Sequence, residues 1–206
     1  MNTIITIGRQ YGSGGREIGV RLAEKLGVPF YDKELLKKAA EQSGLCEALF
    51  DSYDERPASL LYSIAMDSYI ISKPGGNEDT LEEQVHLAVV KAIRQAAEQG
   101  GCVIIGRCAD WVLEGNPRLL STFIYAPLEK RIERVAQREN LSVEKARTMI
   151  QRTDKCRAAY YEYDSNKTWG AVDSYQLCLD SSCMGLEAAV DILYDIAQRK
   201  EQSLAK

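Results

Sequence analysis

Short aliphatic and β-branched runs alternate along this chain with segments in which apolar residues recur every three or four positions. The runs predict buried strands at about 3–7, 29–31, 102–105, 119–125 and 175–179. The periodic segments predict helices at about 16–26, 127–139, 143–161 and 186–198. Strands that alternate with helices in this way predict an α/β fold, with a parallel sheet covered on both faces.

Residues 33–99 interrupt this alternation, because the whole segment is helical in character. It begins with an apolar stripe near Leu35 and continues with periodic stretches at 59–71 and 81–97. The residues Pro-Gly-Gly-Asn at 74–77 separate the last two stretches. The pattern therefore predicts a helical segment between the second and third strands.

A glycine-rich turn follows the first strand directly. Residues 8–17 read Gly-Arg-Gln-Tyr-Gly-Ser-Gly-Gly-Arg-Glu, and an amphipathic helix begins near Arg16. Glycines let backbone N–H groups approach an anion, and the N-terminus of a helix carries partial positive charge. The turn therefore predicts a phosphate-binding loop, and a tight turn without a ligand is the alternative.

This loop departs from the G-x-x-x-x-G-K-[ST] motif, in which a lysine and a hydroxyl follow the second glycine. With Gly15 as the second glycine, the first-glycine, lysine and hydroxyl positions hold Gln10, Arg16 and Glu17. With Gly14 as the second glycine, they hold Arg9, Gly15 and Arg16. Neither of these two alignments of the loop with the motif, here called loop registers, supplies both the lysine and the hydroxyl.

Composition favours a globular protein of one domain. The 206 residues are 45% hydrophobic, which is enough to build a core. No apolar run reaches 18 residues and the first strand begins at once, so we expect neither a membrane span nor a signal peptide. The six cysteines show no C-x-x-C spacing, and Cys102 and Cys178 fall in expected core strands. We therefore expect reduced thiols and a cytoplasmic protein without a membrane partner.

The net charge of −4 is distributed unevenly along the chain. Between Lys130 and Arg157 there are nine basic and four acidic residues, so this segment carries +5. A local basic segment on an acidic protein favours a small polyanion over a nucleic acid, which needs a broad positive face. A solvated helix that carries ion pairs between its own residues is the alternative.

Polar residues follow two further expected strands. Arg107 and Asp110 come after the strand at 102–105, and Asp180 to Ser182 come after the last strand. Open α/β sheets bind ligands beyond the carboxyl ends of their strands, which is also where the glycine loop is expected. These residues are therefore candidates for the same site, and helix capping is the alternative for Asp110 and Asp180.

The chain resembles the cytidylate-kinase-like branch of the P-loop nucleoside monophosphate kinases over nearly its whole length. The segments that carry the resemblance are 8–19, 30–32, 106–110, 126–134 and 179–182. The resemblance implies a three-layer α/β/α P-loop nucleotide-kinase fold that forms a single domain, 1–206. Its core would comprise 1–32, 100–138 and 166–206, with a helical acceptor-binding insert at 33–99 and a lid at 139–165.

The resemblance also implies an ATP-dependent phosphotransferase that acts on a nucleoside monophosphate of the CMP or dCMP type, with Mg²⁺. The implied ATP-binding residues are Tyr11, Gly12, Ser13, Gly14, Gly15, Arg16 and Glu17, with Glu17 also the candidate magnesium ligand. The implied catalytic residues are Arg16, Arg131 and Arg134. The implied acceptor-binding residues are Asp32, Arg107, Asp110, Arg152, Asp154 and Arg157.

The missing lysine leaves two alternatives to this function. One is a P-loop kinase of a non-nucleotide metabolite. The other is a nucleotide-binding protein whose altered loop supports little or no transfer. Turnover with a panel of acceptors separates the kinases, and ATP binding without turnover indicates the binding protein.

Overall fold

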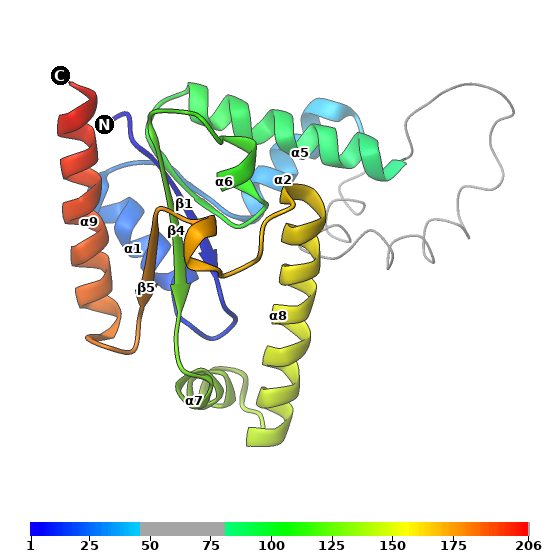
Figure 1. Ribbon diagram of the computed structural model, residues 1–206. Coiled ribbons are helices and arrows are strands. Elements are labelled where there is room, and N and C mark those ends of the chain that lie inside the picture. Colours follow the sequence, from blue (N-terminus) through cyan, green and yellow to red (C-terminus); the bar gives the residue numbers. More distant parts are fainter. Residues whose placement is uncertain (46–80, 206) are drawn as a thin grey trace, which may run out of the picture.

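The computed structural model describes residues 1–45 and 81–205, and Figure 1 shows a central sheet between helices. The sheet has the order β2-β3-β1-β4-β5, and its pairs are parallel. Its strands are β1 (Ile4–Arg9), β2 (Phe30–Tyr31), β3 (Cys102–Ile105), β4 (Leu119–Tyr125) and β5 (Leu177–Asp180). This confirms the predicted three-layer α/β/α fold.

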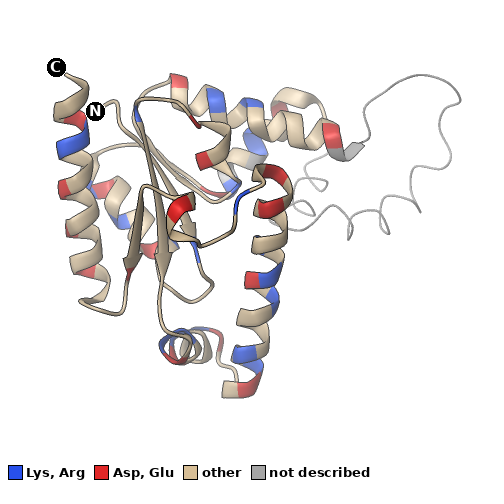
Figure 2. Ribbon diagram, in the orientation of Figure 1, with Lys and Arg blue, Asp and Glu red and all other residues tan. Residues whose placement is uncertain are grey.

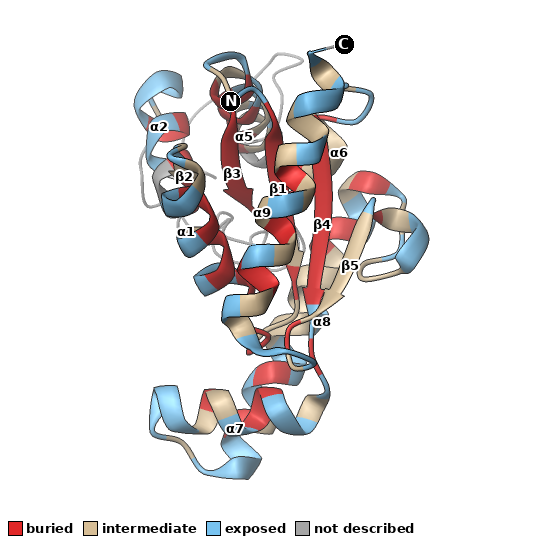
Figure 3. Ribbon diagram, turned by 90° about the vertical axis from the view of Figure 1, so that its left-hand side faces the viewer, coloured by how far each residue is buried: buried red, intermediate tan, exposed pale blue. Residues whose placement is uncertain are grey.

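Helices cover both faces of the sheet, and the central strands are therefore buried (Figure 3). Alternate β1 residues point to opposite faces, so Ile4 packs in one core and Ile5 in the other. On the side of Ile5 lie α1 (Gly15–Leu26) and α9 (Gly185–Leu204). On the side of Ile4 lie α2 (Lys33–Ser43), α5 (Leu81–Glu98) and the short α6 (Ala109–Val112).

The helices α7 (Leu128–Glu139) and α8 (Val143–Ser165) form a hairpin beyond the carboxyl end of the sheet (Figures 1 and 3). The start of α8 packs on α7 through a small separate core that includes Val135 and Ile150. The end of α8 inserts Tyr160 and Tyr161 into the main core. The first half of α8 is therefore supported by a smaller group of buried side chains than its end.

The ends of the expected elements lie within four residues of those in the structure, except that α9 continues to Leu204, six residues beyond its expected end. The first strand extends to Arg9, because pairing with β4 continues to Arg9 opposite Ile124. Pro127 caps α7 and does not begin it, whereas Ser142 caps α8 as expected, accepting a hydrogen bond from the Lys145 amide. Cys178 is half-buried because β5 is an edge strand.

Other elements were missed or lie outside the described residues. The last strand begins two residues later than expected, after a 3₁₀ turn at Val172–Ser174. The sequence pattern also missed α6, whose four residues are too few to show a helical period. The expected helix at 59–71 lies outside the described residues. The division into core, insert and lid stays a prediction.

Candidate active site

The glycine loop joins β1 to α1 and opens on the N-terminus of that helix. Gly12 and Gly14 both adopt left-handed backbone angles, with φ of 81° and 84°. A Cβ atom on Gly12 would lie 2.8 Å from Val135 Cγ2, and one on Gly14 would lie 2.6 Å from Leu186 Cδ2. Both positions therefore require glycine for conformation and for space.

The structure favours one of the two loop registers. Gly14 is the N-cap of α1 and Gly15 is its first helical residue. If the capping glycine is the motif's second glycine, Gly15 occupies the lysine position and Arg16 the hydroxyl position. The lysine position therefore has no side chain at all.

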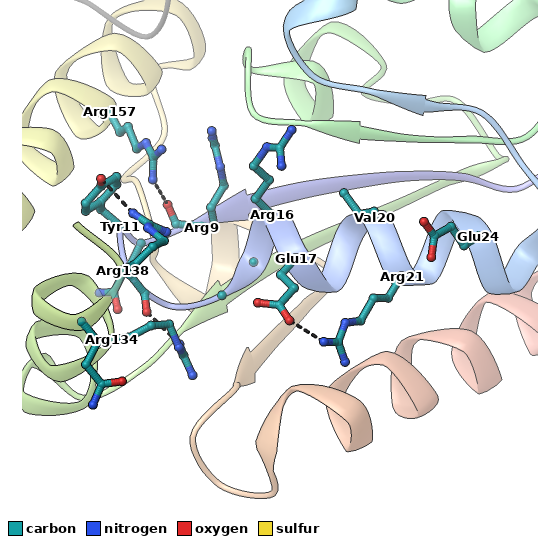
Figure 4. A pocket seen from close by; sticks show the side chains of 15 residues that line it. Arg9, Tyr11, Arg16, Glu17, Val20, Arg21, Glu24, Arg134, Arg138 and Arg157 are labelled. Carbon is teal, nitrogen blue, oxygen red and sulfur yellow. Dashed lines mark hydrogen bonds and ion pairs between the residues drawn. The ribbon is translucent and has the colours of Figure 1, made fainter. Parts of the chain in front are cut away.

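A cavity of about 1050 Å³ lies against this loop (Figure 4). Such a volume suits a ligand of the size of a nucleoside triphosphate. Six arginines and two glutamates are among its described lining residues: Arg9, Arg16, Arg21, Arg134, Arg138, Arg157, Glu17 and Glu24. The excess of four positive charges favours a polyanionic ligand.

The expected ATP-binding residues surround this cavity with one exception. Tyr11, Gly12, Gly14, Gly15, Arg16 and Glu17 line it. Ser13 is instead fully buried, and its carbonyl oxygen accepts a hydrogen bond from the Ser181 hydroxyl. Ser13 therefore anchors the loop to the protein and does not face the cavity.

The loop already binds one anionic group of the protein. The backbone N–H of Tyr11 donates a hydrogen bond of 2.7 Å to Asp154 Oδ1, from α8. The other oxygen of Asp154 accepts a hydrogen bond of 2.6 Å from Arg131 Nη1. Asp154, an expected acceptor ligand, thus connects the loop to α7 and α8.

Arg131 and Arg134 lie on one face of α7, as expected, and both contact the loop backbone. Arg131 Nη1 donates to the carbonyl oxygen of Tyr11 at 3.3 Å, and Arg134 Nη1 donates to that of Gly12 at 2.7 Å. Arg134 lines the large cavity, whereas Arg131 is buried behind it. Basic and acidic residues alternate on this hairpin in Figure 2, so part of its charge is paired locally.

Arg16 extends away from the loop toward the second strand. Its Nε donates a hydrogen bond of 2.7 Å to Asp32 Oδ2, and its side chain is 66% exposed. Glu17, the candidate magnesium ligand, accepts a hydrogen bond from Arg21 one turn later on α1 (Figure 4). Both residues are therefore engaged with protein groups at the edge of the cavity.

A second, narrow cavity of about 20 Å³ lies on the other side of the β1 carboxyl end. Its described lining residues include Arg107, Asp110 and Arg157, together with Tyr160, Tyr161 and Trp169. Three of the expected acceptor-binding residues thus meet here. This volume is below that of a nucleotide, so a ligand of that size requires the cavity to widen.

Arg107 is held in a strained, buried turn beside this cavity. Gly106, Arg107 and Cys108 all have positive φ, at 66°, 60° and 51°. Nη2 of Arg107 lies 3.7 Å from Asp32 Oδ1, and both side chains are buried. Left-handed non-glycine residues cluster at ligand sites, where the surrounding structure holds them in place.

Asp110 is one of the residues that line the second cavity. Burial raises the pKa of its carboxyl group, although a 2.8 Å hydrogen bond from the Tyr161 hydroxyl opposes the rise. Burial and the neighbouring Asp110 carboxylate raise the pKa of Tyr161. The pair thus presents buried polar atoms next to aromatic rings, an arrangement suited to a nucleobase.

The remaining expected acceptor ligands separate into two cases. Arg157 Nη1 donates to the carbonyl oxygen of Arg9 at 3.2 Å, and its guanidinium lies 5.6 Å from the centre of the Tyr11 ring. Arg152 is exposed on α8 and lines neither cavity. The structure thus brings Arg157 to the site and leaves Arg152 outside it.

Sequence reasoning missed two side chains near the loop. Arg9 lines both cavities, and Arg138 lines the larger one, with its guanidinium 5.2 Å from the centre of the Tyr11 ring. The signal for Arg9 was its place directly after the first strand, at the carboxyl edge where ligands bind. The signal for Arg138 was weaker, since nothing in the sequence distinguishes it from the other arginines of the same basic segment.

The described residues are compatible with ATP and Mg²⁺. The loop and the arginine excess fit a triphosphate. Within 1–45 and 81–205, no group of three His, Cys, Asp or Glu side chains is placed to hold a metal. Mg²⁺ bound to a nucleotide needs only one or two carboxylates besides phosphate and water oxygens. Glu17 lines the cavity, but in the favoured register Arg16 and not Glu17 holds the hydroxyl position, so Glu17 as the magnesium ligand stays a prediction.

The parallel sheet and the glycine loop on a helix N-terminus, beside an arginine-lined cavity, are features of the P-loop kinase fold. The cytidylate kinase-like family model matches residues 4–183. This chain therefore belongs to the cytidylate kinase-like family, which supports a kinase of a nucleotide or another small molecule. Among the described helices, none is long and apolar enough to cross a membrane.

Comparisons with individual proteins agree with this family. The chain is 30% identical to a cytidylate kinase of Methanopyrus kandleri, over 95% of this chain and 96% of that one. It is similar to the crystal structure of an uncharacterized protein from Eubacterium ventriosum, with a TM-score of 0.69, 26% identity and 95% and 98% coverage. A shikimate kinase from Bacteroides thetaiotaomicron, at 14% identity, TM-score 0.54 and 96% and 99% coverage, shares the fold.

Proposed function

We propose that this protein transfers the γ-phosphoryl group of ATP to a nucleoside monophosphate of the CMP or dCMP type. The observation that carries the proposal is the pair of cavities on either side of the β1 carboxyl end. The large cavity suits the triphosphate of a donor, and the narrow one combines a buried arginine with aromatic rings. Curated relatives named cytidylate kinase support the choice of acceptor.

The residues of the large cavity would bind and polarise the donor. Loop N–H groups would hold the β-phosphate, and Arg134 and Arg16 would turn from their present partners toward the phosphates. Phosphoryl transfer needs positioning and positive charge more than covalent chemistry from the protein. Bound Mg²⁺ would neutralise charge on the phosphate oxygens, with Glu17 as its protein ligand.

The residues of the narrow cavity would bind the acceptor. Arg107 would hold the acceptor's monophosphate, with Asp32 fixing its orientation, and Asp110 with Tyr161 would contact the base. A phosphate oxygen of the acceptor forms the new bond to phosphorus as the bond to the ADP oxygen breaks. The products are ADP and a nucleoside diphosphate, and closure of α8 over the acceptor would exclude water.

An acceptor panel tests this function. ADP formation is measured with ATP, Mg²⁺ and CMP, dCMP, UMP, AMP, GMP, shikimate or gluconate, and without acceptor. We expect CMP or dCMP to give a kcat/KM at least tenfold above the other acceptors. Preference for a non-nucleotide acceptor would refute the substrate class. ATP binding by calorimetry without turnover on any acceptor would indicate a nucleotide-binding protein instead.

A variant separates the two cavities. Arg107→Lys keeps the positive charge but loses the planar fork that binds phosphate at two points. We expect the KM for the acceptor to rise while the Kd for ATP stays at the wild-type value. An equal loss of affinity for ATP would argue against separate donor and acceptor cavities.

A further inference from the structure

We propose that Arg9 supplies the positive charge that the loop lacks at its lysine position, and that it contacts the transferred phosphoryl group. This inference rests on the proposed function, because it concerns the donor's γ-phosphate. It adds a catalytic residue that neither loop register assigns to that role. Three observations on described residues support it.

First, Arg9 fills the space in which a side chain at the lysine position would begin. A Cβ atom on Gly15 would lie 2.7 Å from Arg9 Cβ and 3.2 Å from Arg9 Cγ. It would also lie 3.2 Å from Ile124 Cβ on the neighbouring strand. The Arg9 stem and a lysine at position 15 therefore exclude each other, so one cationic side chain replaces the other.

Second, Arg9 lies at the boundary between the two cavities. Among the described lining residues, only Arg9 and Arg157 are common to both. In-line transfer moves a phosphoryl group from donor to acceptor across this boundary. A cation there faces the group in transit, whereas a cation elsewhere in the large cavity faces the bound donor.

Third, the structure fixes Arg9 and shields it from water. Arg9 ends the central strand, pairs in register with Ile124 and is 9% exposed. Its carbonyl oxygen also accepts the hydrogen bond from Arg157. A preorganised, desolvated charge stabilises a transition state more strongly than an exposed one.

Arg16, which holds the lysine position if Gly15 is the second glycine, is less suitably placed than Arg9. Arg16 is 66% exposed and its Nε is hydrogen-bonded to Asp32. In Figure 4, Arg9 and Arg16 extend side by side from β1 and α1. Arg9 is the more buried of the two, and Arg16 does not line the narrow cavity.

The steric exclusion between positions 9 and 15 provides a test. The variants are Arg9→Gly, Gly15→Lys, the double variant R9G/G15K, and the double variant R9A/G15K. Glycine at position 9 removes the Cβ that lies 2.7 Å from the new Cβ, whereas alanine retains it. Arg199→Ala, on the exposed side of α9, is the matched loss of one arginine charge.

Turnover and binding are both measured, with thermal unfolding to verify that each variant folds. We expect Arg9→Gly to lower kcat by about 10²–10³. We expect it to weaken binding of ATP more than binding of ADP, because the γ-phosphate is the group contacted. The kcat of R9G/G15K should be at least tenfold higher than that of Arg9→Gly, whereas the kcat of R9A/G15K should show no such increase. Arg199→Ala should have the kcat of the wild type.

Several results would overturn the proposal. One is an Arg9→Gly variant with kcat within twofold of the wild type. Another is equal loss of ATP and ADP affinity, which would mark a structural role. A third is failure of R9G/G15K to exceed Arg9→Gly while remaining folded. If the wild type transfers phosphate to no acceptor, the proposed function fails, and the ATP-to-ADP affinity ratio alone decides whether Arg9 contacts the γ-phosphate.

Discussion

The Arg131–Asp154 ion pair connects the α7–α8 hairpin to the phosphate loop, so removing it tests how the site is held together. Nη1 of Arg131 and Oδ2 of Asp154 are 2.6 Å apart, and the side chains are 9% and 16% exposed. Asp154 also accepts the Tyr11 N–H. The perturbation is a double-mutant cycle of Arg131→Met, Asp154→Leu and the combination.

Burial of the pair sets the expected magnitude. Removing one partner of a buried pair leaves an uncompensated charge and costs about 3–5 kcal/mol. Arg131 keeps hydrogen bonds to two backbone carbonyl oxygens, and Asp154 retains some exposure, so we expect about 2–3 kcal/mol for each single variant. Replacing both partners with apolar residues leaves no unpaired buried charge. The double variant should therefore be destabilised by about 1–2 kcal/mol less than the sum of the two single variants.

The assay is urea denaturation followed by circular dichroism, with hydrogen exchange of the hairpin amides to detect local opening. The exposed Lys167–Glu114 pair, at 2.7 Å with side chains 34% and 58% exposed, is the control, and its removal should cost about 0–1 kcal/mol. Additivity of Arg131→Met and Asp154→Leu to within about 0.5 kcal/mol would refute the coupling. Exchange rates in α7 unchanged by either variant would refute the connection to the hairpin.

Three further predictions concern other parts of the fold. Burial raises the pKa of Asp110, so the folded state keeps a proton that the unfolded chain releases above about pH 4, and stability falls as pH rises through the raised pKa. Asp110→Asn should flatten this fall in urea midpoints between pH 4 and 8, and an unchanged slope would contradict the assignment. Gly12→Ala should cost about 1–3 kcal/mol and abolish ATP binding, because its Cβ would lie 2.8 Å from Val135 Cγ2 at φ +81°. Gly27→Ala, with φ +65° and open space, is the control that adds conformational strain alone, and an equal effect on ATP binding would remove the steric explanation. Finally, amides in the first half of α8 should exchange faster than those of β1 in ligand-free protein, since only a small separate core supports them, and equal protection would argue against a moving lid.

Much of the fold could be predicted from local pattern. The strands at 102–105 and 119–125 match the structure residue for residue, because each is a mostly apolar run with clear limits: Gly101 and Gly106 flank the first, and Arg118 and Pro127 enclose the second. The loop between β1 and α1 was predictable because its glycines have a local conformational role. The short helix α6 and the late start of β5 were not, since neither leaves a periodic signal.

The sequence by itself determined the layered α/β fold, the phosphate loop and the collection of arginines, because these depend on residue type and spacing over short distances. Only the tertiary structure decided which arginine occupies which place. The Arg9 side chain occupies the space next to Gly15 because the end of β1 lies against the start of α1. Asp154 reaches the Tyr11 amide across 143 residues, because the α7–α8 hairpin folds over the loop. Side-chain spacing in sequence carries no information about such contacts, since they arise from how helices pack beyond the carboxyl end of the sheet.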